Sequence, residues 1–112
     1  MAKRTLRRAP RAAPSVPELD ALVHQRVRLG ILSALAAGGA MSFTDLKTVL
    51  DLTDGNLSVH ARKLEDAGYV AVNKSFDDRT PRTDYELTTK GSTALTGYLD
   101  AMEALIQATR NG

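Results

Sequence analysis

Apolar residues recur at intervals of three and four positions across residues 18–37, which predicts a first amphipathic helix. The "AGGA" of residues 37–40 ends this helix. Residues 41–43 are too few for more than a short edge pairing. Ser42 or Thr44 can then cap a short second helix. Its inner face is expected to hold Leu46, Val49 and Leu50.

A tight turn, "DLTDG" at residues 51–55, precedes a third helix at about residues 55–67. Thr53 or Asp54 can cap its beginning, and Gly68 ends it. Its apolar positions fall on one face, formed by Leu57, Ala61 and Leu64. The opposite, polar face is therefore open to solvent or to a ligand.

After Gly68 the pattern changes from helical spacing to alternation. Residues 69–75 and 82–88 alternate apolar and polar side chains, which is typical of strands, and a polar loop with one proline joins them at residues 76–81. A last helix opens at "TTKG" and covers about residues 89–110. The chain is therefore predicted to have an α+β, mostly helical fold.

This order of elements predicts a winged helix-turn-helix, in which two helices joined by a tight turn precede a β-hairpin. The ordinary use of this architecture is DNA recognition. The third helix would enter the major groove, and the hairpin loop, or wing, would touch the flanking backbone or minor groove.

A helical wheel divides the polar residues of the third helix. At about 100° per residue, the direction away from the buried face is occupied by a small set of side chains, namely Asn56, Ser58, Val59, Arg62 and Lys63. Amide and guanidinium groups suit adenine and guanine edges, a valine methyl suits thymine, and hydroxyl and ammonium groups suit phosphates. His60 lies about 60° from the buried centre, so we expect it to pack or cap rather than contact DNA.

In the wing, Arg79 and Arg82 are the candidate DNA contacts, with Lys74 at its base. Asp77 and Asp78 count against a simple phosphate clamp, since they would either orient these arginines or weaken binding. His24, in the first helix, is expected to have a structural role, and a phosphate contact from that helix is the alternative.

The last helix carries an apolar stripe that is wider than its own small domain needs. We therefore expect a dimer interface formed with the start of the first helix. The expected interface residues are Leu19, Leu22, Val23, Leu95, Tyr98, Leu99, Met102, Leu105 and Ile106. The alternative is that this helix folds entirely onto its own domain.

The composition of the chain is consistent with this predicted fold and narrows the class of protein. With 112 residues, 43% hydrophobic and 25% charged, the chain suits one soluble domain. It has no cysteine, so disulfides and thiolate sites are excluded. No apolar run is long enough to cross a membrane, and there is no secretory signal, so a cytoplasmic protein is expected.

The net charge of +2 hides an asymmetry. Residues 1–17 hold five basic and no acidic residues, which leaves ten basic and thirteen acidic residues, a net of −3, in the domain at residues 18–112. Residues 1–17 are rich in arginine, alanine and proline and are expected to be a disordered basic tail. A solubilising tail, a DNA-contacting arm and a transit peptide all fit this composition.

Three segments carry a family resemblance: "HQRVRLGILSAL" (24–35), "MSFTDLKTVLDLTDGNLSVHARKLEDAGYV" (41–70) and "DDRTPRTDYELTTKG" (77–91). They resemble winged-helix transcriptional regulators of the MarR and ArsR type, above all the small single-domain group. The resemblance implies a homodimer that binds a pseudo-palindromic operator, usually as a repressor. In that family an acid beside an arginine aims the arginine into the minor groove, and Asp78 and Arg79 match this pair. The family's metal-sensing clusters do not carry over.

Two other functions are alternatives to DNA-binding regulation. A winged-helix module that contacts another protein remains an alternative, because the domain itself is net acidic. An enzyme is not expected, since no phosphate-cradling glycine loop, carboxylate pair or Ser-His-Asp arrangement is present. We expect no cofactor and no metal. A small-molecule effector could bind between the first and last helices, but no residue identifies one.

Overall fold

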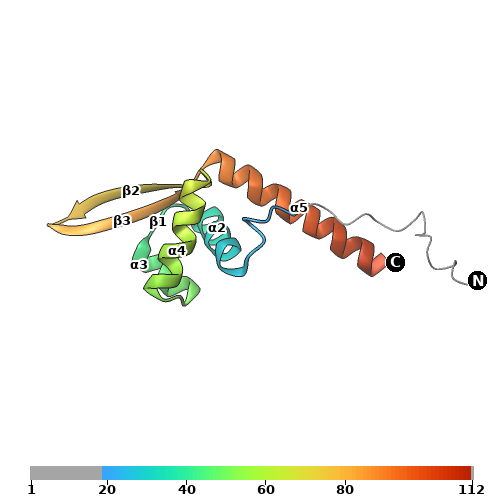
Figure 1. Ribbon diagram of the computed structural model, residues 1–112, viewed down its shortest axis with the longest axis horizontal. Coiled ribbons are helices and arrows are strands. Elements are labelled where there is room, and N and C mark those ends of the chain that lie inside the picture. Colours follow the sequence, from blue (N-terminus) through green and yellow to red (C-terminus); the bar gives the residue numbers. More distant parts are fainter. Residues whose placement is uncertain (1–18, 112) are drawn as a thin grey trace, which may run out of the picture.

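The computed structural model describes residues 19–111, which form four helices and three strands (Figure 1). The elements follow in the order α2 (Arg26–Gly38), β1 (Met41–Ser42), α3 (Phe43–Leu50), α4 (Asp54–Asp66), β2 (Val70–Asp77), β3 (Thr80–Leu87) and α5 (Thr89–Asn111). The predicted α+β, mostly helical winged helix-turn-helix is confirmed. The basic tail predicted for residues 1–17 lies outside the described residues.

The first helix begins later than predicted, at Arg26 instead of residue 18. Residues 21–23 form a separate turn, which the Asp20 carboxylate caps by accepting from the backbone N–H groups of Leu22 (2.9 Å) and Val23 (3.2 Å). The His24 N–H donates to the Asp20 carbonyl oxygen at 2.7 Å, but the chain is then extended at Gln25, with φ of −151° and ψ of 132°, so this turn does not continue into α2. Gln25 then caps α2 by accepting from the Arg28 N–H at 2.8 Å.

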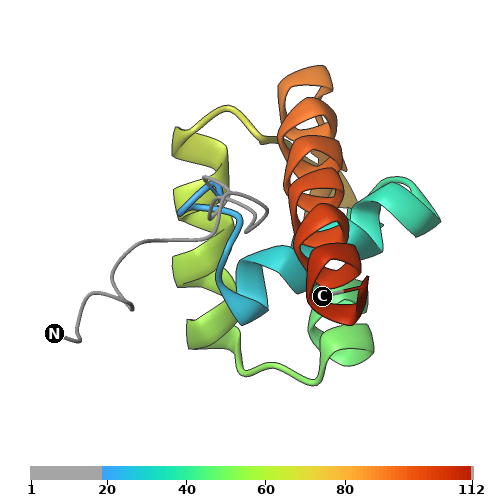
Figure 2. The same cartoon turned by 90° about the vertical axis from the view of Figure 1, so that its right-hand side faces the viewer.

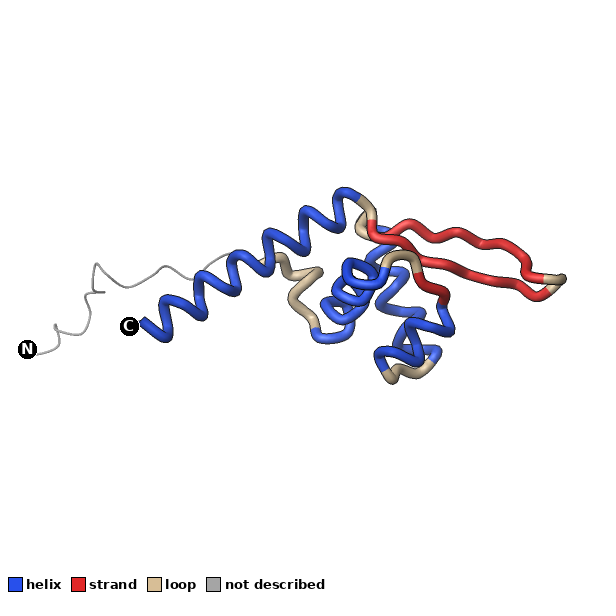
Figure 3. The backbone as a smooth tube through the Cα atoms, turned by 180° about the vertical axis from the view of Figure 1, so that it is seen from behind, coloured by secondary structure: helices blue, strands red, loops and turns tan. Residues whose placement is uncertain are grey.

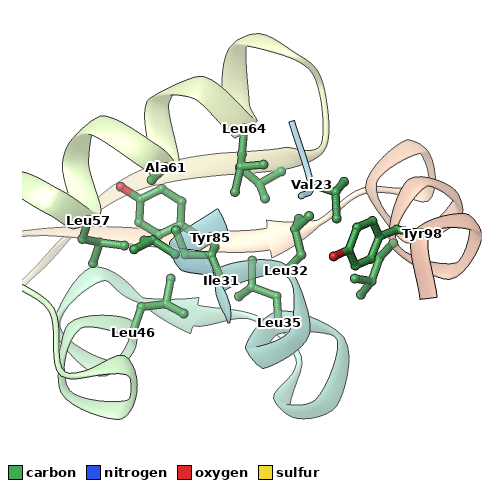
Figure 4. Close-up of a cluster of buried hydrophobic side chains, with 13 residues drawn as sticks. Val23, Ile31, Leu32, Leu35, Leu46, Leu57, Ala61, Leu64, Tyr85 and Tyr98 are labelled. Atoms are coloured by element: carbon green, nitrogen blue, oxygen red, sulfur yellow. The ribbon is translucent and has the colours of Figure 1, made fainter. Parts of the chain in front are cut away.

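One hydrophobic core joins all the larger elements (Figure 4). Its buried apolar residues are Val23, Val27, Ile31, Leu32, Leu35, Leu46, Leu57, Ala61, Leu64, Val70, Tyr85, Leu95 and Tyr98. The predicted buried face of α4 is therefore confirmed. Burial of this apolar surface is the main favourable contribution to folding.

The predicted inner face of α3 is wrong at one position. Val49 is 63% exposed, whereas Leu46 is fully buried. Leu50 packs against α2 at Gly30, where the absence of a side chain lets Leu50 approach the helix. A Cβ atom at Gly30 would lie 3.4 Å from Leu50 Cδ2. This contact turns α3 toward Leu50 and leaves Val49 on the surface.

The sheet is antiparallel with strand order β1-β3-β2. The two predicted strands are confirmed, but they extend into the expected loop, and Asp77 pairs with Thr80. Only Asp78 and Arg79 remain as the turn, with φ of 50° and 73°. Pro81 is tolerated in β3 because β1 pairs only with Asp84 and Tyr85, so β3 is an edge strand at the proline.

The "TTKG" segment attaches α5 to the turn between α4 and β2. The Thr88 hydroxyl donates to the Gly68 carbonyl oxygen (2.6 Å) and accepts from the Gly91 N–H (2.9 Å). A side chain at position 91 would overlap the Tyr69 carbonyl oxygen, so only glycine fits there.

From this attachment α5 packs against α2 (Figure 2). It then extends beyond the rest of the domain (Figure 1). The hairpin of β2 and β3 projects from the opposite end of the molecule (Figure 3). In the part of the chain that the structure describes, no helix is both long enough and apolar enough to cross a membrane.

Candidate nucleic-acid interface

The turn between α3 and α4 is fixed by local contacts at each of its ends. Asp51 ends α3 in the left-handed conformation, with φ of 54°. Thr53 caps α4, its hydroxyl accepting from the Asn56 N–H at 3.1 Å. An ion pair of 2.8 Å between Lys47 and Asp54 links the two helices. These contacts hold α3 and α4 in a helix-turn-helix arrangement.

The outer face of α4 is exposed at every predicted position, namely Asn56, Ser58, Val59, Arg62 and Lys63. Val59 is 54% exposed in the middle of this polar face. Arg62 approaches Asp66 at 3.4 Å, and both side chains are largely exposed. A surface pair of this kind contributes at most about 1 kcal/mol, so Arg62 can leave it for a ligand. Contact of this face with DNA stays a prediction.

His60 lies at the inner edge of α4 and packs against α2. Its Nδ1 is 3.1 Å from Nη1 of Arg28. Since a guanidinium can only donate, Nδ1 accepts this hydrogen bond and the ring proton of the neutral form is on Nε2. Burial, followed by the positive charges of Arg28 and Lys63, lowers the pKa of His60. His60 therefore packs as an uncharged side chain, as its place on the helical wheel indicates.

The other histidine also has a structural contact. Nδ1 of His24 lies 2.7 Å from the Tyr98 hydroxyl, and the two rings are 5.6 Å apart. This contact joins the segment before α2 to α5. The structural role that the sequence favours for His24 is thus supported by its position.

The wing presents its basic residues on an exposed hairpin. Arg79 occupies the tip, and Lys74 is exposed on β2. Arg82 is not free, because its Nε donates to both carboxylate oxygens of Asp84 at 3.1 and 3.0 Å. The hydrogen bond to Asp84, and then the charges of the nearby acids, raise the pKa of Arg82. All three predicted wing contacts are exposed, and of these only Arg82 forms an ion pair within the described residues.

A cavity of about 200 Å³ lies between α4 and the sheet. Its lining contains three of the predicted DNA-contacting residues, Ser58, Arg62 and Lys74, together with Glu65, Val72 and Tyr85. Glu65 and Tyr85 are not among the site residues that the sequence pattern predicts. Strand alternation indicates that Tyr85 points inward, but it cannot indicate that the edge of its ring borders a surface cavity.

The predicted dimer residues separate into two groups. The structure places Val23, Leu95 and Tyr98 inside the core of the chain itself, at 0%, 5% and 6% exposure, so they are not on a surface that a partner could reach. Part of the apolar stripe of α5 packs into the core of its own domain, and the rest faces outward. The side chains that are left at or near the surface are Leu19, Leu22, Leu99, Met102, Leu105 and Ile106.

A helix-turn-helix whose second helix has an exposed polar face, followed by a β-hairpin with an arginine at its tip, defines a winged-helix protein of the kind that binds nucleic acid. Residues 27–106 match the family described as "Winged helix DNA-binding domain". The chain belongs to this family.

Within residues 19–111 no group of three or more histidine, aspartate and glutamate side chains is placed to hold a metal ion.

Known proteins share both the sequence and the fold. An uncharacterized protein of Methanocaldococcus jannaschii is 40% identical over 73 residues, which cover 65% of this chain and 79% of that protein. The transcriptional regulator homologue of Pyrococcus horikoshii OT3 is 38% identical, with a TM-score of 0.74, over 79% of this chain and 87% of that one. MarR, at 19% identity and a TM-score of 0.66, shares the fold over 74% of this chain and 60% of its own. The predicted resemblance to winged-helix transcriptional regulators is confirmed, and the fold is shared with MarR.

Proposed function

We propose that the protein is a sequence-specific transcriptional regulator, most simply a repressor, which binds a pseudo-palindromic DNA operator as a homodimer in the cytoplasm. α4 would lie in the major groove, and the wing would lie on the flanking minor groove or backbone. The supporting observation is that Ser58 and Arg62 of α4 border the same cavity as Lys74 of β2. The outer face of α4 and the base of the wing therefore form one continuous surface.

In this arrangement the side chains of α4 divide between bases and backbone. Asn56 and Arg62 would hydrogen-bond base edges, and Val59 would contact a thymine methyl group. Ser58 and Lys63 would bind phosphates and so fix the position of α4 on the duplex. At the wing tip, Arg79 would enter the minor groove, which attracts arginine where it is narrow.

The proposed dimer uses the apolar side chains that α5 leaves uncovered. Leu99 and Ile106 are 48% and 42% exposed, and Met102 and Leu105 lie beside them. A second copy of the chain could cover this stripe, with Leu19 and Leu22 at its edge. Two copies of α4 placed about 34 Å apart would match successive major grooves.

The decisive experiment is selection of bound sequences from random DNA duplexes at two salt concentrations. We expect a palindromic consensus with half-sites one helical turn apart. Arg62→Ala and Arg79→Ala should weaken binding to it, whereas Arg110→Ala, which removes the same charge near the far end of α5, should not. If no duplex is enriched, or if binding ignores both substitutions in α4 and the wing, the proposal is wrong.

A second candidate function is protein–protein contact through the same winged-helix surface. It is favoured by the net charge of −3 outside residues 1–17 and by the carboxylates of Asp77, Asp78 and Asp84 in the wing. The same selection separates the two functions, because this alternative predicts no enriched duplex. We propose no catalytic activity and no cofactor, and a small-molecule effector between α2 and α5 stays a prediction.

A further inference from the structure

Tyr85 is a buried residue whose hydroxyl has no partner within the described chain. It is 7% exposed, lies opposite Val72 and Met41 in the sheet, and stacks at a tilt on Phe43 with 6.4 Å between ring centres. The other two tyrosine hydroxyls are both hydrogen-bonded, Tyr69 to Asp20 and Tyr98 to His24. For Tyr85 no such bond is formed with any residue from 19 to 111. The Tyr85 hydroxyl is therefore free to hydrogen-bond a group that occupies the space it faces.

The hydroxyl end of Tyr85 borders the cavity between α4 and the sheet. Figure 4 shows the ring with its oxygen directed away from the centre of the core and toward the side of α4. The cavity of about 200 Å³ is lined there by Ser58, Arg62 and Glu65 of α4 and by Lys74 of β2. This volume is several times that of one water molecule, so it has room for a group of phosphate size.

The groups around this cavity favour an anion. Of the charged groups that line the cavity, Arg62 and Lys74 are positive and Glu65 is negative. Arg62 is also paired with Asp66, outside the lining, at 3.4 Å, whereas Lys74 forms no ion pair with another described residue. Burial, and secondly the charge of Glu65, raise the pKa of Tyr85. Its hydroxyl therefore keeps its proton at neutral pH and can donate. The hydroxyls of Tyr85 and Ser58 and the ammonium group of Lys74 form a donor set that fits the oxygens of a phosphate.

We propose that this cavity binds one phosphodiester group of the DNA backbone, with the Tyr85 hydroxyl donating to a phosphate oxygen beside Lys74 and Ser58. This inference rests on the DNA-binding function proposed above and assigns Tyr85 a positioning role within it. The DNA strand that passes from the major groove at α4 to the minor groove at the wing would cross this cavity. A phosphate held there would fix the distance between Arg62 and the base edges. Contacts to the DNA backbone fix the position of a protein on the duplex, whereas contacts to bases determine which sequence it recognises.

The test is Tyr85→Phe, which removes only the hydroxyl. Because that hydroxyl makes no bond within residues 19–111, the free protein should keep or slightly raise its melting temperature. Affinity for DNA should fall about tenfold, by the same factor on the selected operator and on unrelated duplexes. Tyr69→Phe is the matched control. It removes a hydroxyl bonded to Asp20, so it should lower the melting temperature and leave DNA affinity unchanged when measured well below melting.

Two further measurements identify the bound group. In Glu65→Gln, loss of the opposing carboxylate should strengthen DNA binding severalfold. In an operator scanned with single methylphosphonates, one position per half-site should weaken wild-type binding, and this effect should disappear in Tyr85→Phe. Inorganic phosphate, titrated at constant ionic strength, would shift the ring signals of Tyr85 if the cavity prefers free phosphate to backbone.

The outcomes separate this inference from the function on which it rests. If the wild-type protein binds no duplex, the proposed function itself fails. If it binds DNA and depends on Arg62, but Tyr85→Phe binds as tightly as wild type, the phosphate site is wrong and the function stands. Saturation by free phosphate without any methylphosphonate effect would also overturn the backbone assignment.

Discussion

The Tyr69 hydroxyl donates a hydrogen bond of 2.6 Å to Oδ2 of Asp20, across 49 positions of the sequence. The other carboxylate oxygen of Asp20 accepts from the backbone of Leu22 and Val23. The Tyr69 carbonyl in turn accepts from the Thr88 N–H at 3.1 Å. Tyr69 therefore ties the segment before α2 and the beginning of α5 to the base of the wing.

This pair should make stability depend on pH in acid. Burial tends to raise the pKa of Asp20, but the hydrogen bonds from Tyr69, Val23 and Leu22 together lower it. A lowered carboxyl pKa stabilises the fold above the unfolded value of about 3.9 and loses that contribution as pH falls through the folded value. In Tyr69→Phe we expect about 1 kcal/mol less stability at pH 7 and a smaller loss between pH 5 and 3, measured by urea unfolding. An unchanged acid profile would contradict this role.

His60 should add a second pH dependence nearer neutrality. Its pKa is lowered by burial and by Arg28 and Lys63, so the folded state disfavours the charged ring. The associated stability is present above the unfolded pKa of about 6.5 and is lost as pH falls through the lower folded value. NMR titration should find His60 below 6.5. His60→Asn should reduce the loss of stability between pH 7.5 and 5.5, and His24→Asn serves as the comparison.

Gly91→Ala should destabilise the protein by about 1–3 kcal/mol or more, because the new methyl group would overlap the Tyr69 carbonyl oxygen and approach Leu87 Cδ1. Gly97→Ala is the matched control on the same helix, since nothing lies within 4 Å of a Cβ there. It should raise stability by roughly 0.5–1 kcal/mol through helix propensity. Thermal unfolding of both variants tests the pair, and equal effects would refute the close approach at Gly91.

Arg79→Gly should separate stability from function at the wing tip. Arg79 has a φ of 73°, which glycine adopts without the Cβ penalty, so hairpin stability should rise by up to about 1 kcal/mol. DNA affinity should nevertheless fall. The slope of the logarithm of the binding constant against the logarithm of the salt concentration should become less steep by about one per protomer. Arg79→Lys keeps the charge and the unfavourable φ. It should preserve the salt slope without the gain in stability, as measured by binding at several salt concentrations and by thermal unfolding.

Leu99→Glu and Ile106→Glu should dissociate the proposed dimer. Each places a charge on the exposed apolar stripe of α5, outside the buried core of the protomer. We expect monomers by sedimentation, with secondary structure retained and operator affinity greatly reduced. Gln107→Glu adds the same charge at the neighbouring exposed position and should leave the assembly intact. A wild-type monomer at micromolar concentration would contradict the dimer directly.

Patterns of local origin were predictable from the sequence. The helical spacing of Leu57, Ala61 and Leu64 determined which face of α4 is buried, because side-chain direction in a helix follows from position alone. Alternation identified β2 and β3 for the same reason. Thr53 and Gly68 marked the ends of α4, since caps depend on backbone conformation and on side chains a few residues away.

Predictions that depend on the surroundings of an element failed at specific residues. The helix expected from residue 18 was wrong because Asp20 caps a separate turn and accepts from Tyr69, and the chain is extended at Gln25 before α2 begins. Val49 is exposed because Leu50 takes the contact with α2 at Gly30. In both cases a competing contact, which periodicity does not record, determined the outcome.

The sequence by itself determined the order of elements, the winged-helix architecture and the exposed face of α4, since these follow from periodicity and turn residues. Only the tertiary structure decided that Val23, Leu95 and Tyr98 belong to the core of one chain, because an apolar stripe does not identify the surface that covers it. It also decided that Tyr85 meets Lys74 and Ser58 at one cavity, since strand register and helix docking bring together groups that are distant in sequence.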